Sequence, residues 1–160
     1  MKMKVAALIF GLAVLVLGTQ SASAQYVEKK TVSLALAKKM AVAAEAEAVK
    51  NNWTMVFVIV DDGGNLVYLG RMDGTQIGSI EVAQGKARTA LQFKRPTKAL
   101  QDVIDMGQPH VITLDHITAV QGGLPIMLDG KVIGAIGASG GTSPQDEQCA
   151  QAGLTALSEK

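Results

Sequence analysis

The residues with the clearest chemical potential lie in one basic segment, residues 82–101. It contains five cations, no acid and one aromatic ring, Phe93. The cations are Lys86, Arg88, Lys94, Arg95 and Lys98. Cations beside an apolar slot can hold a planar ligand that carries carboxylate groups. The same pattern is also typical of a solvated helix face, and the residue types alone leave both interpretations open.

A nucleophile motif lies near the C-terminal end of the chain. Gly137-Ala138-Ser139-Gly140-Gly141 matches G-x-S-x-G, the motif in which an α/β-hydrolase places its catalytic serine. In that fold an acid and a histidine follow the serine, and here no histidine follows His116. We therefore interpret Ser139 as part of a strand end whose glycines turn the backbone.

Candidates for metal binding or acid–base chemistry are few. His110 and His116 are the two histidines, and each could be an iron donor or a plain loop residue. Asp61 and Asp62 could act as paired carboxylates, but the Gly63-Gly64 that follows them predicts a turn. The sequence shows no spacing typical of a nucleophile–base pair or of metal ligands. It leaves catalysis undecided and favours a binding protein.

Three passages near the C-terminal end resemble one protein family. They are Gly122–Ile126, Val132–Gly141 and Pro144–Ala150. Further matches lie upstream, at Val60–Leu66, Arg71–Gly74, Lys86–Ala90 and Pro96-Thr97. Taken together, the chain resembles the GlcG/HbpS family of small haem-binding proteins from about Leu34 to Gly153. The resemblance implies a profilin-like fold and haem as the cofactor.

The resemblance also suggests which residue approaches the haem iron. Thr97, in the Pro96-Thr97 match, is the predicted donor, and His116 is the alternative. A neutral hydroxyl is a weak iron donor, so binding through Thr97 would be modest and exchangeable, as suits a carrier. Thr97 as a plain helix cap stays open as a second interpretation.

The remaining haem contacts are predicted from residue type. Phe93 and Met72 are expected to line the apolar slot, and three cations are expected to hold the haem carboxylates. These cations are Lys86, Arg88 and Arg71. Arg71 could instead pair with Asp73, two residues further on.

The leading functional hypothesis is an exported protein that sequesters or relays haem outside the cytoplasm. A second hypothesis is an accessory protein or enzyme for a small carboxylate such as glycolate, which the GlcG name suggests. A corrinoid is another planar candidate, because a related domain occurs fused to cobalamin adenosyltransferases. A third is a structural or sensory partner of a membrane protein. Homo-oligomers are expected, because a small sheet has edges to cover and the family forms them.

The first half of the chain is predicted to form a helix, a hairpin and a second helix. Residues 31–51 read as a helix with Leu34, Ala37, Val42 and Val49 at roughly helical spacing. Residues 54–60 and 65–71 read as antiparallel strands around the 61–64 turn. A helix over 79–93, capped by Ser79, has a small inner face formed by alanines.

The second half of the chain completes an α+β fold. We expect a short helix over 97–106, short strands or a loop over 107–123, and strands 124–128 and 131–138 around Asp129-Gly130. Ser143 is expected to cap a last helix, with Pro144 at its first position and Asp146 three residues on, close to a capping box. Two hairpins with flanking helices predict a single domain with an antiparallel, profilin-like sheet rather than a doubly wound parallel one.

The first 24 residues read as a Sec signal peptide. Lys2 and Lys4 precede an apolar run, and Ala22-Ser23-Ala24 matches a cleavage site. Cleavage would leave a domain of residues 25–160, periplasmic or secreted and without a membrane anchor. It would also change the formal net charge from +1 to −1, a balance that gives no indication of nucleic-acid binding. Cys149 is the single cysteine, and burial is favoured over pairing between chains.

Overall fold

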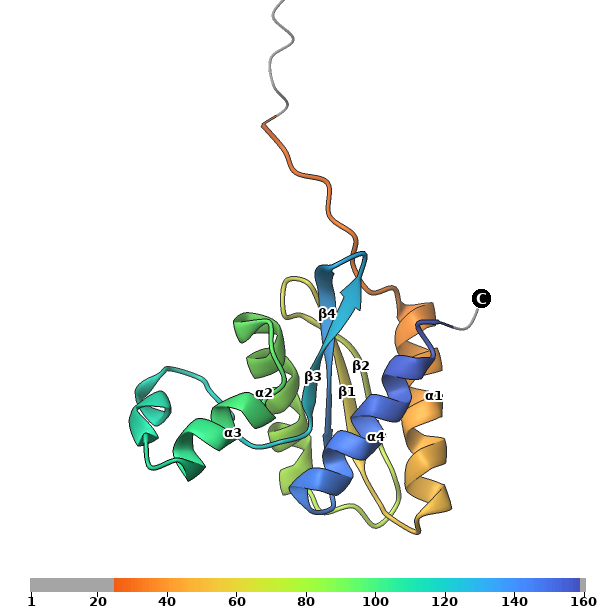
Figure 1. Cartoon of the computed structure of the whole chain (residues 1–160). Helices are drawn as coiled ribbons and strands as arrows, with labels where there is room; N and C mark the ends of the chain where they lie inside the picture. The colour runs from red at the N-terminus through yellow and green to blue at the C-terminus, as the bar shows by residue number, and fades with distance from the viewer. Residues whose placement is uncertain (1–24, 159–160) are drawn as a thin grey trace, which may run out of the picture.

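A four-stranded antiparallel sheet with helices on both faces forms the body of the protein (Figure 1). The computed structural model describes residues 25–158, so the predicted signal peptide, residues 1–24, lies outside the described residues. The spatial order of the strands is β2-β1-β4-β3. The strands are β1 (Val56–Asp61), β2 (Leu66–Arg71), β3 (Gly123–Leu128) and β4 (Lys131–Ser139).

The helices divide between the two faces of this sheet. One face is covered by α1 (Leu34–Lys50) and α4 (Ser143–Thr155), and the other by α2 (Gly78–Phe93) (Figure 1). The short helix α3 (Lys98–Asp105) and the 3-10 helix η1 (Pro109–Thr113) project from the α2 side. The predicted α+β fold, with an antiparallel sheet and flanking helices in one domain, is confirmed.

Strand β1 supplies both faces of the core. Because side chains alternate along a strand, Phe57 and Ile59 pack toward α1 and α4, whereas Val58 and Val60 pack toward α2. All four are buried. A strand buried on both faces reads as a continuous apolar run, which is why the sequence predicted it.

Small residues let α2 lie close to β4. Ala83 and Ala87 of α2 are fully buried, as predicted for its inner face. They face Gly137 of β4, where a Cβ would lie 2.8 Å from the backbone nitrogen of Ala87. This close packing sets the position of α2 and of every side chain that it carries.

Helix α1 buries a different face from the one predicted. Its buried residues are Ala37, Met40, Ala41, Ala44 and Ala48. Leu34, Val42 and Val49, which we expected to face the core, are all exposed. The expectation followed the larger side chains, but α1 packs through alanines, whose small size permits the close contact with α4.

Two predicted helix caps are wrong, and a third is confirmed in position only. Helix α2 begins at Gly78 and buries Ser79, so Ser79 is not its cap. Thr97 occupies the cap position of α3, as predicted, but its side chain makes no capping hydrogen bond. Helix α4 begins at Ser143, so Pro144 is its second residue, and Thr142 occupies the cap position. There the Gln145 side chain accepts a hydrogen bond from the Thr142 N–H at 2.8 Å. Residues 107–122, where short strands or a loop were expected, form a loop that contains η1.

Two other predictions are confirmed. Asp129 and Gly130 both have positive φ, of 50° and 73°, as a type I′ hairpin turn requires. Cys149 is buried in α4, and burial raises the pKa of its thiol to about 12. Among residues 25–158, no helix is both long and apolar enough to span a membrane.

Candidate functional site

A buried ion pair connects α2 to the start of α4. Lys86 exposes only 1 % of its surface, and its Nζ lies 2.6 Å from Oδ2 of Asp146. The same Nζ donates to the carbonyl of Ala138 at 3.1 Å. The ammonium that we expected to bind a haem carboxylate is therefore already held by an internal carboxylate.

Asp146 also fixes the glycine turn that precedes α4. Its Oδ1 accepts the Gly141 N–H at 3.0 Å, while its Oδ2 binds Lys86. Burial raises the pKa of Asp146 and lowers the pKa of Lys86, and the ion pair opposes both shifts. A buried pair of this kind indicates a structural role, because each charge depends on the other for compensation.

Thr97 lies in the same buried region. Its Oγ1 accepts the Gly123 N–H at 2.9 Å, and its own N–H donates to the Gly123 carbonyl at 2.9 Å. A Cβ at Gly123 would lie 2.7 Å from both the carbonyl carbon of Lys86 and Cγ2 of Thr97, so glycine is required there. We call Lys86, Thr97, Gly122, Gly123 and Asp146 the junction. Since Thr97 is fully buried, an iron atom could reach its hydroxyl only after the junction opened.

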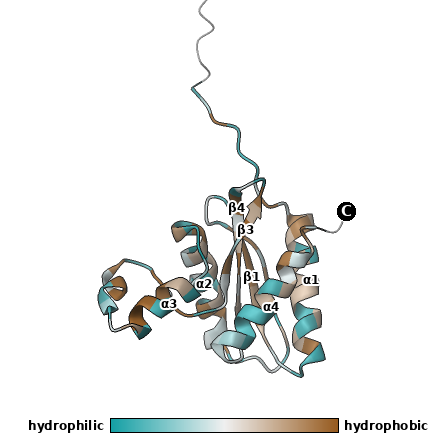
Figure 2. Cartoon of the chain, in the orientation of Figure 1, coloured by the Kyte–Doolittle hydropathy of each residue, from teal (hydrophilic) through white to brown (hydrophobic). Residues whose placement is uncertain are grey.

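A projecting lobe, residues 98–121, lies beside α2 and contrasts with the junction. One hydrogen bond from its backbone holds it to α2, and a second lies within the lobe. Thr118 N–H donates to Thr89 Oγ1 and Gln121 N–H donates to Gln101 Oε1, both at 2.8 Å. The lobe exposes apolar side chains to solvent, and Figure 2 shows apolar residues along α3 and η1. The exposed apolar residues are Met106, Ile112, Leu114 and Val120.

Phe93 and His116 lie on or beside this lobe. Phe93 is half-buried and follows Thr89 by one helical turn, so it lies on the side of α2 that the lobe contacts. His116 is exposed, two residues before Thr118. Arg88 is also exposed, but it precedes Phe93 by five residues and so lies on a different face of α2.

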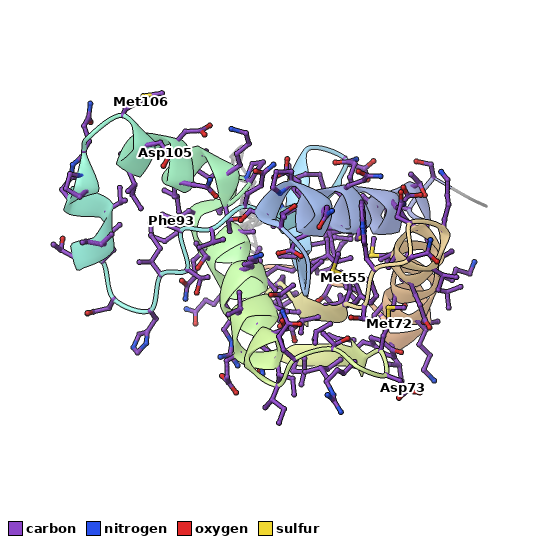
Figure 3. The ribbon with its side chains drawn as sticks, turned by 90° about the horizontal axis from the view of Figure 1, so that it is seen from below. Met55, Met72, Asp73, Phe93, Asp105 and Met106 are labelled. Carbon is purple, nitrogen blue, oxygen red and sulfur yellow. The ribbon has the colours of Figure 1, made fainter. Side chains whose placement is uncertain are left out.

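Met72 and Arg71 lie elsewhere. Figure 3 shows Met72 beside α1, on the opposite side of the molecule from Phe93. Met72 packs against the core between the sheet and α1, and Arg71 donates from Nη1 to the Thr75 carbonyl at 2.7 Å. Within one chain, therefore, Phe93 and Met72 do not line a common slot. They could face one ligand only if different subunits supplied them.

A groove of about 950 Å³ forms a second region with binding potential. It lies between residues 27–30, the end of α2 and the β3–β4 hairpin, and sequence reasoning missed it. Its apolar wall is formed by Val27, Leu91, Met127, Leu128, Val132 and Ile133. Its charged rim contains Lys29, Lys30, Lys94 and Lys131 together with Glu28, Asp62 and Asp129. We call it the lysine groove.

Two of the four lysines in this groove are paired. Lys30 Nζ lies 2.7 Å from Asp129 Oδ2, and Lys29 Nζ lies 3.7 Å from Asp62 Oδ2. Lys94 and Lys131 make no ion pair within the part of the chain that the structure describes. The lysines are far apart in sequence, so only the fold reveals the groove.

The described residues contain no cluster of three or more histidine, cysteine or acidic side chains that could hold a metal ion. Asp61 is the last residue of β1, and its Oδ1 stabilises the predicted turn by accepting the N–H groups of Gly63 and Asn65.

Comparison with known proteins identifies the family. The family described as "Haem degrading protein HbpS-like" matches residues 32–155. The chain belongs to the HbpS-like family. GlcG of Escherichia coli K12 is 37% identical over 111 residues, which cover 69% of this chain and 83% of GlcG.

Solved structures of HbpS-like proteins share the fold. The ORFY protein of Klebsiella pneumoniae is 34% identical with a TM-score of 0.81, over 85% of this chain and 97% of ORFY. PduOC, solved as a haem complex, is 30% identical with a TM-score of 0.72, over 79% of this chain and 94% of PduOC. Haem is thus a ligand of this similar protein.

Proposed function

We propose that the protein is an exported haem-binding protein that sequesters or relays haem outside the cytoplasm. Export rests on the signal-peptide pattern of residues 1–24. Haem binding rests on membership of the HbpS-like family and on the haem complex of the similar PduOC. Within the chain, one observation carries the proposal: the lobe, with its exposed apolar side chains and accessible His116, contacts the side of α2 that carries Phe93.

The residues of the lobe surface match the chemical groups of haem. Phe93 and the exposed lobe side chains contact the ring, and His116 binds the iron. Of the two predicted iron donors, accessibility favours His116, because Thr97 is buried in the junction. The surface is open in a single chain, so a second copy covers the ring and the protein works as a homo-oligomer.

A haem titration of residues 25–160, read in the Soret region, tests this proposal. We expect saturable binding near one haem per subunit, with His116→Ala and Phe93→Ala each weakening it by about tenfold or more. His110→Ala is the matched control, because His110 is also an exposed histidine of the lobe. Absence of a saturable Soret shift would overturn the proposal. An equal loss of haem affinity in the two histidine variants would exclude His116 as the iron donor.

The lysine groove supports a second candidate function, binding of a small carboxylate. Its volume suits a small ligand, and Lys94 and Lys131 supply cations at the rim of an apolar wall. Calorimetric titration with glycolate, octanoate and cobalamin separates carboxylate binding from corrinoid binding. If a carboxylate binds, we expect Lys131→Glu to weaken its affinity. Lys39→Glu, which changes an exposed lysine of α1, should leave that affinity unchanged. No heat with any of the three ligands would exclude this candidate.

A further inference from the structure

The apolar wall of the lysine groove is aliphatic. In the part of the chain that the structure describes, the groove has no aromatic lining residue, and Gln92 is its one uncharged polar side chain. The wall combines Leu91 of α2, Met127 of β3, and Val132 and Ile133 of β4. A flat ring system gains most from aromatic partners, and a ligand rich in hydroxyl or amide groups needs polar ones. This wall therefore suits a plain aliphatic chain.

Part of the wall is open to solvent. Met127 is 43% exposed and Val27 is 81% exposed, while Leu91, Leu128 and Val132 are half-buried. These side chains still face water, so contact with an apolar ligand would remove apolar surface from solvent. The groove volume of about 950 Å³ leaves room for a ligand much larger than a two-carbon acid.

The rim of the groove offers more positive than negative charge to a ligand. Asp62 and Asp129 are each paired with a lysine of the segment 29–30. Two cations and one anion of the rim make no ion pair within the described residues, namely Lys94, Lys131 and Glu28. The balance favours a ligand whose polar end is a single carboxylate.

We propose that the lysine groove binds a free medium- or long-chain fatty acid, with the chain on the aliphatic wall and the carboxylate at Lys94 and Lys131. This inference rests on the carboxylate-binding candidate described above for the groove, and it names the class of carboxylate. Glycolate has no chain to contact the wall. A corrinoid carries amide groups for which the groove offers few partners.

A chain-length series tests the class of ligand. Residues 25–160 are titrated by calorimetry with glycolate, octanoate, decanoate and dodecanoate, each below the concentration at which it forms micelles. We expect the affinity to rise about fivefold for every two methylene groups, since part of each methylene leaves water in an open groove. Equal affinity for glycolate and dodecanoate would overturn this inference and keep the small-carboxylate candidate. No heat with any of the four acids would overturn both.

A pair of methionine variants tests the place of the chain. Met127→Ser removes an apolar contact from the wall and should weaken dodecanoate binding by about fivefold. Met106→Ser is the matched control, because Met106 is an exposed methionine of the lobe, 73% exposed. It should leave the affinity for dodecanoate unchanged. Equal weakening by the two variants would indicate adsorption to any apolar surface and would contradict the proposal.

Two lysine variants test the place of the carboxylate. Lys94 has a φ of 51°, which glycine adopts easily, so Lys94→Gly removes the ammonium without straining the end of α2. Lys94→Gly and Lys131→Met should each weaken dodecanoate binding by about threefold. Binding of 1-octanol, which has a chain but no charge, should not change, and Lys39→Met on α1 should affect neither ligand. Unchanged dodecanoate binding in the double lysine variant would overturn the proposed head-group contact.

An anionic membrane lipid offers the same chemistry as a free fatty acid, an aliphatic chain with a negative head group. Sedimentation with phosphatidylglycerol vesicles separates the two sources. We expect the protein to stay in the supernatant and to bind monomeric dodecanoate. Sedimentation with the vesicles, without heat from monomeric dodecanoate, would overturn the proposal in favour of a membrane surface.

Discussion

The junction and the lobe both contact α2 but differ in how they are held. At the junction, Lys86, Thr97 and Asp146 are buried and each makes at least one hydrogen bond within the chain. In the lobe, α3 buries only Leu100 and η1 only Val111, while larger apolar side chains face solvent. The polar side chains of the junction make their hydrogen bonds within the chain, whereas the exposed side chains of the lobe remain available to a ligand or a partner.

This contrast predicts a separation of effects. Changes at the junction should lower the free energy of unfolding and leave ligand affinity per folded molecule unchanged. Changes in the lobe should lower ligand affinity and leave the free energy of unfolding unchanged. A single junction variant that weakened haem binding without loss of stability would break the comparison.

The largest effect is expected from Lys86→Met. It leaves Asp146 buried without its cation, which should cost about 3–5 kcal/mol of unfolding free energy at neutral pH. Loss of the ammonium also raises the pKa of Asp146 further. A carboxyl whose pKa is higher in the folded state than in the unfolded state destabilises the fold while it is ionised. This destabilisation decreases as the pH falls through the folded-state pKa. Urea denaturation should therefore show a smaller loss at about pH 5 than at about pH 7.

The double variant Lys86→Met with Asp146→Asn is the control for this prediction. It removes both charges, so it should regain part of the stability and show a weaker dependence on pH. If the double variant lost the sum of the two single losses, Lys86 and Asp146 would not be energetically coupled.

Gly137→Ala should have the next largest effect. The new methyl group would lie 2.8 Å from the Ala87 nitrogen and force α2 away from β4. We expect a loss of about 3 kcal/mol in urea denaturation. Gly78→Ala is the control, because a Cβ there meets no atom within 4 Å. Equal stability of the two variants would show that α2 is less constrained than the structure indicates.

Thr97→Val tests the role of this hydroxyl. The change keeps the shape of the side chain but leaves the buried Gly123 N–H without its acceptor, at a cost of about 1–2 kcal/mol. Haem affinity, measured in the Soret titration below the unfolding transition, should be unchanged. A selective loss of affinity would restore Thr97 as the iron donor.

The smallest effect on stability is expected in the lobe. Met106→Ser combined with Ile112→Ser removes two exposed apolar side chains and should change the unfolding free energy by less than about 0.5 kcal/mol. Haem affinity should nevertheless fall by about tenfold, because the ring loses apolar contacts. Unchanged affinity would place the haem away from this surface.

The sheet was predictable because its signals are local. A continuous apolar run marks β1, and Asp129-Gly130 marks the β3–β4 turn with residues that tolerate positive φ. The buried face of α1 was not predictable, because the helix packs through alanines while its larger residues face solvent. Side-chain size indicates a buried face only when the helix has room for large residues.

The candidate site was less predictable than the fold. Phe93 lies on the lobe side of α2 and His116 is exposed on the lobe, but Met72 lies across the molecule from Phe93 and Lys86 is buried. The local sequence places Asp146 near a helix cap. It gives no indication that Asp146 pairs with Lys86, since the two are separated by 60 residues. Pairing of charges that are distant in sequence depends on how the helices pack, and no local sequence pattern predicts that packing.

The separation between Lys86 and Asp146 has a consequence for the order in which the elements can dock. Lys86 can leave water without large cost only when the first turn of α4 is in place. That turn follows α2, α3, β3 and β4 along the chain. Until it docks, α2 has no counter-charge for its buried ammonium. The α2 side of the core therefore closes together with α4 and not before it.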